Sequence, residues 1–199
     1  MSTIWEYLEE NPLLLNEDEM TEFIKEAMSR RWISHIWEHY EDYCKGVDTY
    51  ALYAKAVDQM FPLQGKNILE IASGRHCLLA YHMSTYGANV TAIDPVAKPK
   101  KSGFVVIPER FDDKFDVEPY DCLVAFNPEF CLESIVEQSV RNNKKAIIGA
   151  SNREDYQLNG RNVNKETYLE EYLTPKYGVK ETEVLFNDNT KGNIICINL

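Results

Sequence analysis

The sequence has no CxxC pair and no apolar run that approaches the roughly 18 residues of a membrane-spanning helix. Its five cysteines are an odd and scattered set, which argues against a disulfide scaffold and for a reducing compartment. The start of the chain is acidic and lacks the apolar segment of a signal peptide. We therefore expect a cytoplasmic protein without a membrane anchor.

Basic side chains are also scarce. The chain of 199 residues carries 21 Lys and Arg against 32 Asp and Glu, a formal net charge of −11. Because nucleic-acid affinity comes largely from neutralising phosphates, this balance argues against a nucleic-acid partner and for a small-molecule or protein substrate. Hydrophobic residues make up 44%, which is enough to build the core of one ordinary domain.

The first part of the chain, residues 1–63, reads as an N-terminal helical segment, since apolar residues recur there at helical spacing. Its Trp and Tyr side chains could cover a pocket as a lid, pack as helices, or form a partner interface. His35 and His39 stand four residues apart, but no third ligand recurs at suitable spacing. A packed helix surface is the favoured interpretation, and we expect no metal site.

Residues 64–199 show a different pattern, in which short apolar runs alternate with helical segments. A final pair of runs joined by Asn187–Gly192 predicts a hairpin. Helices are expected over 76–86, over 130–141, and from Asn164 through Leu173 with a stop at Pro175. The expected fold is α/β, a Rossmann-like and mostly parallel sheet with one antiparallel strand from the C-terminal hairpin. The predicted strands are 66–72, 89–95, 104–107, 120–126, 145–150, 179–186 and 193–199.

The segment ILEIASGRHCLLAYHMSTYGANVTAIDP, residues 68–95, resembles the first strand–turn–helix–strand unit of the class I S-adenosylmethionine-dependent methyltransferases. With the order of the later elements, the resemblance covers residues 50–199. It implies S-adenosylmethionine as cofactor, bound outside the carboxyl ends of the strands near the switch point of the sheet.

The resemblance implies a role for each residue of this unit. Glu70 supports the ammonium end of the cofactor, and the backbone at Ala72 and Gly74 approaches its methionine and ribose parts. Asp94, 20 residues after Gly74, accepts hydrogen bonds from the ribose hydroxyls. Arg75 could pair with the methionine carboxylate. The alternative is that both acids are strand-end residues that face solvent or cap a helix.

The unit departs from the usual Glu-x-Gly-x-Gly-x-Gly pattern, because only Gly74 is retained. Arg75 and His76 are bulky and would narrow the pocket, although His76 is better interpreted as a helix-start residue. After the third strand, Glu109 stands where the resemblance places an acid on the adenine amino group. Asp112, Asp113 and Asp116 lie equally near in sequence, and that cluster is interpreted as a solvated loop face.

A second motif, Asn127-Pro128-Glu129-Phe130, follows the fourth strand. It is similar to the Asn-Pro-Pro-Tyr/Phe motif of methyltransferases that modify amino or amide nitrogens, with Glu129 in place of the second proline. The resemblance implies that Asn127, Pro128 and Phe130 hold the target nitrogen in line with the methyl group. The alternative is a plain strand-ending turn.

Together these features predict an S-adenosylmethionine-dependent methyltransferase acting on a small-molecule or protein nitrogen. The alternative is a non-catalytic protein on the same scaffold that binds S-adenosylmethionine or a partner.

Overall fold

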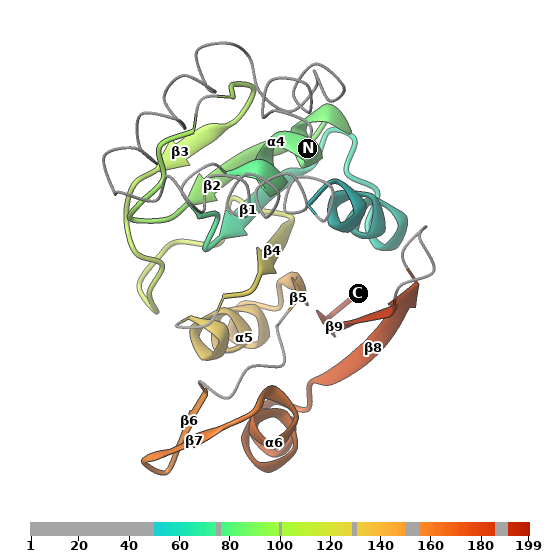
Figure 1. Cartoon of the computed structure of the whole chain (residues 1–199). Coiled ribbons are helices and arrows are strands. Elements are labelled where there is room, and N and C mark those ends of the chain that lie inside the picture. The colour runs from blue at the N-terminus through green and yellow to red at the C-terminus, as the bar shows by residue number, and fades with distance from the viewer. Residues whose placement is uncertain (1–49, 75–76, 100, 129–130, 150–155, 186–190) are drawn as a thin grey trace, which may run out of the picture. The chain divides into compact units, whose positions relative to one another are not determined.

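The structure is a computed structural model that describes residues 50–74, 77–99, 101–128, 131–149, 156–185 and 191–199 (Figure 1). These residues form one compact unit that extends from Ala51 to Leu199. The expectations for residues 1–49, including the lid and the pair His35 and His39, lie outside the described residues. No helix in the described part of the chain is long and apolar enough to cross a membrane.

A seven-stranded sheet forms the centre of this unit, in the order β3-β2-β1-β4-β5-β9-β8. The first five strands are parallel, and β9 runs antiparallel to both β5 and β8. The predicted fold class and the terminal hairpin are therefore confirmed. The strand bounds are β1 Asn67–Ile71, β2 Asn89–Ile93, β3 Val105–Ile107, β4 Cys122–Phe126, β5 Lys145–Gly149, β8 Lys180–Leu185 and β9 Lys191–Ile197.

Helices cover both faces of the sheet (Figure 1). One face carries α4, Leu78–Thr85, which packs on β2. The opposite face carries α5, Leu132–Arg141, whose apolar side joins Leu69, Ile71 and Leu123 in one hydrophobic cluster. The same cluster includes the later elements, namely the small hairpin β6 (Tyr156–Leu158) and β7 (Arg161–Val163), and the helical segments α6 (Lys165–Tyr168), η2 (Leu169–Leu173) and α7 (Thr174–Tyr177).

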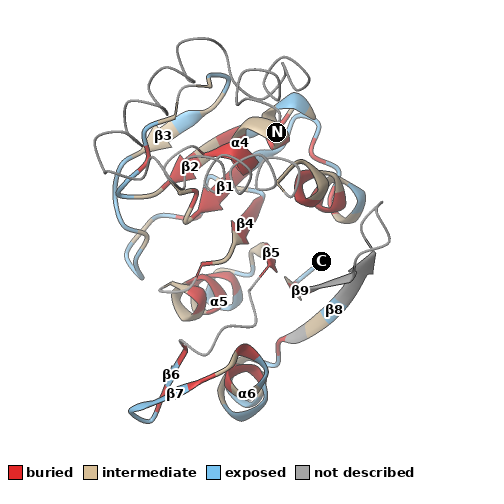
Figure 2. Cartoon of the chain, in the orientation of Figure 1, coloured by how far each residue is buried: buried red, intermediate tan, exposed pale blue. Residues whose placement is uncertain are grey.

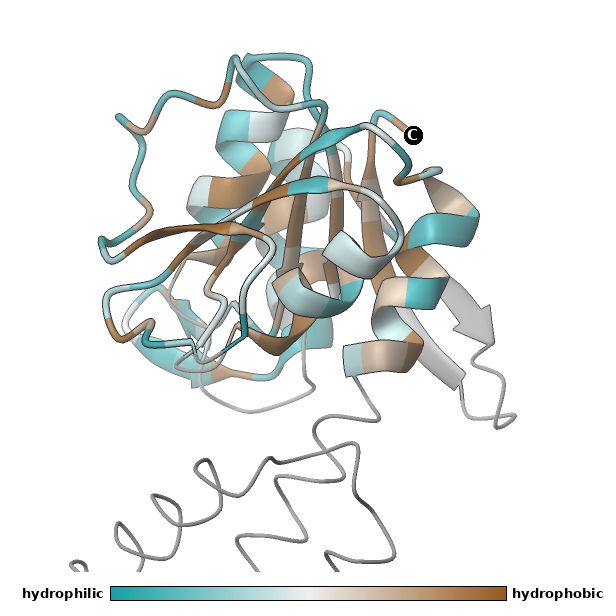
Figure 3. Cartoon of the chain, turned by 90° about the horizontal axis from the view of Figure 1, so that it is seen from above, coloured by the Kyte–Doolittle hydropathy of each residue, from teal (hydrophilic) through white to brown (hydrophobic). Residues whose placement is uncertain are grey.

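The core follows the central strands. β1, β4 and β5 are buried along most of their length, as expected for parallel strands covered on both faces (Figure 2). Apolar residues concentrate along the same strands (Figure 3). β3 has only three residues and stands at the edge, where Val105 is 61% exposed. No helix in the described chain joins β3 to β4, so this corner of the sheet is the least covered part of the unit.

The helix over residues 50–60 is part of the α/β unit. Tyr53 is buried, and its hydroxyl donates to the backbone oxygens of Ala125, at 3.2 Å, and of Ile147, at 3.5 Å. Its ring lies so close to Gly149 that a Cβ there would be 3.0 Å from Tyr53 Cε2. The compact unit thus begins before the predicted boundary at residue 64.

Two local predictions are corrected. Pro175 does not stop the last helix, which continues to Tyr177 and ends at Gly178 with φ +72°. The π-helical turn η2 comes directly before α7, and Pro175 lies in the first turn of α7, where its missing N–H is tolerated. The hairpin β6–β7 was missed, although its turn residues Asn159 and Gly160, both with positive φ, are a strong hairpin signal.

We predict that Tyr53→Phe lowers the free energy of unfolding by about 1 kcal/mol, because it removes a buried hydroxyl that donates to two strand carbonyls. Urea denaturation measures this loss. Tyr86→Phe is the control, since Tyr86 is a half-buried residue at the end of α4 outside this contact. An equal effect of both substitutions would contradict the assigned role of Tyr53.

Candidate functional site

The turn after β1 has a strained backbone. Ala72 has φ +59°, Gly74 has φ +65° and Cys77, which precedes α4, has φ +49°. A left-handed conformation is disfavoured by roughly 1–2 kcal/mol for a residue with a Cβ. Such strain gathers at functional sites, where the surrounding structure maintains it. Arg75 and His76 lie in this turn but outside the described residues.

Gly74 faces open space. A Cβ built at this position would have no heavy atom within 4 Å, so nothing in the described chain fills the volume beside it. A ligand can therefore approach the Gly74 backbone closely, which the predicted cofactor role of this turn requires.

The end of β2 is bonded to this turn. The Gly74 N–H donates to Asp94 Oδ2 at 3.0 Å, and the Val96 N–H donates to Asp94 Oδ1 at 2.9 Å. Asp94 is half-buried. A carboxylate has about four lone-pair sites, so both Asp94 oxygens keep acceptor capacity for hydroxyl groups of a ligand. The structure thus brings together the two residues whose spacing was singled out in the sequence.

Glu70 is buried, with 1% of its surface exposed. Burial, reinforced by the nearby charge of Asp94, raises the pKa of this carboxyl well above its usual range, although a hydrogen bond from the Ala80 backbone opposes the shift. Ala80 is in the first turn of α4, and Cys77 at the N-cap provides no side-chain cap. Glu70 therefore caps α4 from the neighbouring strand, which was the alternative interpretation of this acid.

One carboxyl oxygen of Glu70 is unsatisfied. Oε2 is buried and has no hydrogen-bond partner among the described residues. Such an orphaned acceptor lowers stability unless a donor reaches it. A cationic group of a ligand beside Oε2 would favour the ionised carboxylate, so the cap of α4 leaves this oxygen available to such a group.

The end of β4 contributes a third turn. Asn127 has φ +55° and is half-buried, and its N–H donates to Gly149 O at 2.6 Å. Pro128 is buried, and its carbonyl accepts the Cys131 N–H at 3.1 Å. Glu129 and Phe130 lie outside the described residues.

The third turn lies near the first two, because β1 pairs with β2 on one side and with β4 on the other. Burial raises the pKa of the Cys131 thiol to about 12, and the charge of Asp94 adds to this shift. The turns after β1, β2 and β4 are thus neighbours at the carboxyl edge of the sheet.

Glu109 follows β3 at the same edge of the sheet and is exposed. Its backbone N–H donates to Ile107 O at 2.9 Å, and the structure shows no contact that fixes its side chain toward Asp94. Asp112 and Asp116 each accept the backbone N–H two residues further on. They support the loop 108–121, as expected for a solvated loop face.

These turns meet where the strand order changes direction. β1 pairs with β2 on one side and with β4 on the other. In open α/β sheets, ligands bind outside the carboxyl ends of the strands at such a switch point.

Solved structures share this fold at low sequence identity. Magnesium protoporphyrin IX methyltransferase from Synechocystis PCC 6803, with bound S-adenosylmethionine, aligns with a TM-score of 0.57 at 9% identity, over 82% of this chain and 84% of that chain. A mutant of MtNAS in complex with S-adenosylmethionine aligns with a TM-score of 0.52 at 14% identity, over 88% and 71%. The fold is that of the class I S-adenosylmethionine-dependent methyltransferases. A TehB-like methyltransferase from Corynebacterium glutamicum ATCC 13032 Kitasato aligns with a TM-score of 0.50 at 16% identity, over 80% and 96%. No protein-family model and no curated protein sequence matches the chain.

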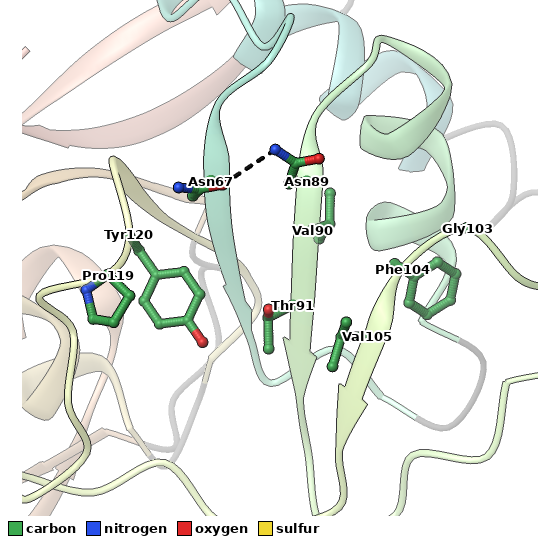
Figure 4. Close-up of a pocket in the computed structure, with 9 residues that line it drawn as sticks. All are labelled: Asn67, Asn89, Val90, Thr91, Gly103, Phe104, Val105, Pro119 and Tyr120. Carbon is green, nitrogen blue, oxygen red and sulfur yellow. Dashed lines mark hydrogen bonds between the residues drawn. The ribbon is translucent and has the colours of Figure 1, made fainter.

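A separate hollow of about 650 Å³ lies at the amino ends of the strands, at the opposite edge of this methyltransferase-type sheet (Figure 4). Among the described elements, no helix follows β3 before β4 to cover this edge of the sheet. Asn89 Nδ2 donates to Asn67 Oδ1 at 3.2 Å on its floor. None of its lining residues was predicted as a site residue, and they are Asn67, Asn89, Val90, Thr91, Gly103, Phe104, Val105, Pro119 and Tyr120.

We predict that Glu70→Gln gains stability relative to the wild type as the pH rises. The raised pKa of Glu70 means that the folded state resists its ionisation, so wild-type stability is highest below the unfolded value near 4.5 and falls at higher pH. Gln can still accept the Ala80 N–H. Urea unfolding between pH 4 and pH 9 measures the difference, and a constant difference across this range would show that Glu70 is ionised without penalty.

Proposed function

We propose that this protein binds S-adenosylmethionine at the turns after β1 and β2 and transfers its methyl group to a nitrogen of a small molecule or a protein. The observation that carries the proposal is the hydrogen bond from Gly74 N–H to Asp94, which joins a strained, open turn to a half-buried carboxylate at the switch point of the sheet. The shared fold supports the same cofactor class.

The described residues fit this cofactor. Asp94 has free acceptor capacity for ribose hydroxyls, and the backbone at Ala72 and Gly74 borders open space. Glu70 Oε2 is an unpaired buried acceptor suited to the ammonium group. Glu109, exposed beyond β3, would contact the adenine amino group once its side chain turns inward.

The bound cofactor would supply an electrophilic methyl group on a sulfonium centre. The protein's task is then to position the nitrogen nucleophile. The Asn127 backbone is held in a left-handed conformation by its bond to Gly149 O, and Pro128 is buried directly behind it. In the proposed site the Asn127 side-chain oxygen and the Pro128 carbonyl oxygen face the N–H groups of the target nitrogen. The lone pair of that nitrogen is then directed at the methyl carbon.

One observation favours the non-catalytic alternative. The Glu70 carboxyl already caps α4 through Ala80, and only Gly74 remains of the glycine-rich pattern. A protein with these features could bind S-adenosylmethionine, or a partner, without transferring the methyl group. The two candidates differ at Asn127, which only the enzyme needs.

We predict that S-adenosylmethionine at about 100 times its dissociation constant stabilises the protein by roughly 2.7 kcal/mol. For a chain of this size the melting temperature then rises by about 5–10 °C. Asp94→Ala should abolish the rise, because it removes both the ribose acceptor and the bond to Gly74. Differential scanning fluorimetry, started from protein purified without ligand, measures the rise in the wild type and its loss in Asp94→Ala.

Asp116→Ala is the matched control. Asp116, like Asp94, accepts the backbone N–H two residues further on, at 3.0 Å, but it lies in the loop before β4. The control should keep the full ligand-induced rise. No rise in the wild type would exclude the cofactor site, and an equal loss in both variants would show a general effect of loop destabilisation.

We predict that Asn127→Gly keeps the cofactor-induced rise but lowers methyl transfer at least 100-fold. Glycine accepts the φ of +55° without strain, so the substitution removes only the side chain. The measurement is transfer of labelled methyl groups from S-adenosylmethionine to a panel of amines and peptides. Detectable wild-type transfer that survives in Asn127→Gly would remove Asn127 from the mechanism.

A further inference from the structure

A cluster of aromatic hydroxyls surrounds one carboxylate at the start of α5. Glu133 accepts a short hydrogen bond from the Tyr172 hydroxyl and longer ones, at 3.5 Å each, from Tyr168 and Tyr177. Lys176 Nζ donates to the same carboxylate at 2.9 Å. We name Glu133, Tyr168, Tyr172 and Tyr177 the tyrosine cage.

The Lys176 ammonium group lies inside this cage. Its Nζ is 4.8 Å from the centroid of the Tyr172 ring and 4.9 Å from that of the Tyr177 ring. It also donates to the Tyr172 hydroxyl at 2.7 Å. Two aromatic faces and one carboxylate around a cation are the arrangement by which proteins recognise alkylammonium ligands.

A rare turn builds the cage. The π-helical segment η2 separates α6 from α7 and includes Tyr172, so that Tyr168, Tyr172 and Tyr177 all reach Glu133 on α5. Short π-helical turns occur frequently at functional sites, because their wider turn is not favoured for its own stability. Stacking of Tyr156 on Tyr168, with ring centroids 5.3 Å apart, supports the cage from behind.

The cage carries a fixed negative charge. Partial burial by itself raises the pKa of Glu133, but hydrogen bonds from Tyr172 and Lys176 outweigh it and lower the pKa below its usual value. The same contacts raise the pKa of Lys176, so both partners stay charged at neutral pH. Their side chains remain 39% and 45% exposed, so the Lys176 ammonium can move into water without crossing the core.

The cage lies at the same edge of the sheet as the proposed cofactor site. α5 begins at Leu132, one residue after Cys131, whose N–H donates to Pro128 O in the turn after β4. Because α5 returns from the carboxyl end of β4, its first turn is at that end. α6, η2 and α7 pack beside α5 on the same face (Figure 1).

We propose that the tyrosine cage recognises an alkylammonium group of the substrate, and that Lys176 occupies it as an internal substitute until the substrate displaces it. The proposal rests on the methyltransferase function proposed above and narrows its substrate to a molecule that carries an alkylammonium group in addition to the uncharged nitrogen that accepts the methyl group, since an ammonium nitrogen has no lone pair. The net charge of −11 favours the approach of such a cation. A cage that only fastens α7 to α5 is the competing explanation.

The test uses choline and its neutral carbon analogue 3,3-dimethylbutan-1-ol as probes, with the full-length chain. In Lys176→Ala the vacated cage should bind choline with millimolar affinity, at least tenfold more tightly than the wild type. The analogue, equal in shape but uncharged, should bind at least tenfold more weakly than choline. NMR titration of the tyrosine ring signals measures the affinities of the wild type and of Lys176→Ala for each of the two probes.

Two further variants separate the cage from general packing. Lys176→Met fills the space with a neutral side chain and should not gain choline affinity. Glu133→Gln in the Lys176→Ala background should lower the choline affinity at least tenfold. Lys176→Ser serves if Lys176→Ala does not fold. Equal binding of both probes, or no choline binding by a folded Lys176→Ala or Lys176→Ser protein, overturns the proposal.

The failure of this proposal is distinct from the failure of the proposed function. Choline binding does not require S-adenosylmethionine, and the cofactor-induced rise in melting temperature does not require the cage. Choline binding without a cofactor-induced rise would retain the ammonium site and overturn its assignment to a methyl-transfer substrate. A cofactor-induced rise without choline binding would overturn the cage alone.

Discussion

The hydrogen bond from the Gly74 N–H to the Asp94 carboxylate joins the ends of two parallel strands whose registers are set independently by the sheet. β1 is paired along its length with β2 and β4, so the three strands must end at the same edge. The polypeptide leaves β1 and β4 there in an unusual conformation, with positive φ at Ala72, Gly74 and Asn127. Besides the Asp94 bond, the turn after β1 is joined to the end of β2 by hydrogen bonds from the Ala72 and Ser73 N–H groups to Ile93 O, at 3.1 and 3.5 Å.

The second constraint is the burial of the Glu70 carboxyl near the hydrogen bond between Gly74 and Asp94. Glu70 caps α4 and thereby compensates for a helix start that lacks a side-chain cap at Cys77. The compensation is incomplete, since Oε2 stays unpaired and Asp94 repels its charge. A site that combines a strained backbone with an unsatisfied buried oxygen is one that a suitable ligand would stabilise. This links the stability of α4 to occupation of the site.

The parts of the proposed site lie on both faces of the sheet. α4 and the strained turn belong to one face, while α5 and the tyrosine cage belong to the other. The turn around Asn127 stands between them, because β4 leads directly into α5. A substrate held by its ammonium group in the tyrosine cage and a cofactor held by Asp94 would therefore both border this turn. The hollow at the amino edge of the sheet lies outside this arrangement.

The sequence alone predicted the strands, the mostly parallel sheet, the terminal hairpin and the positions of Gly74 and Asp94 after two successive strands. Short apolar runs, turn residues and the spacing of 20 positions between Gly74 and Asp94 are local signals. They can be recognised without knowledge of tertiary contacts. The sequence did not show that the helix over 50–60 enters the core through Tyr53, that Glu70 caps a helix from the adjacent strand, or that Pro175 is accommodated next to a π-helical turn. The first two depend on contacts between separate elements of the fold, and the third depends on a π-helical turn for which the sequence pattern gave no signal. The tyrosine cage is like the first two, since Glu133 lies 35 residues from Tyr168 and 43 from Lys176, and only packing of α7 against α5 brings their charges and rings together.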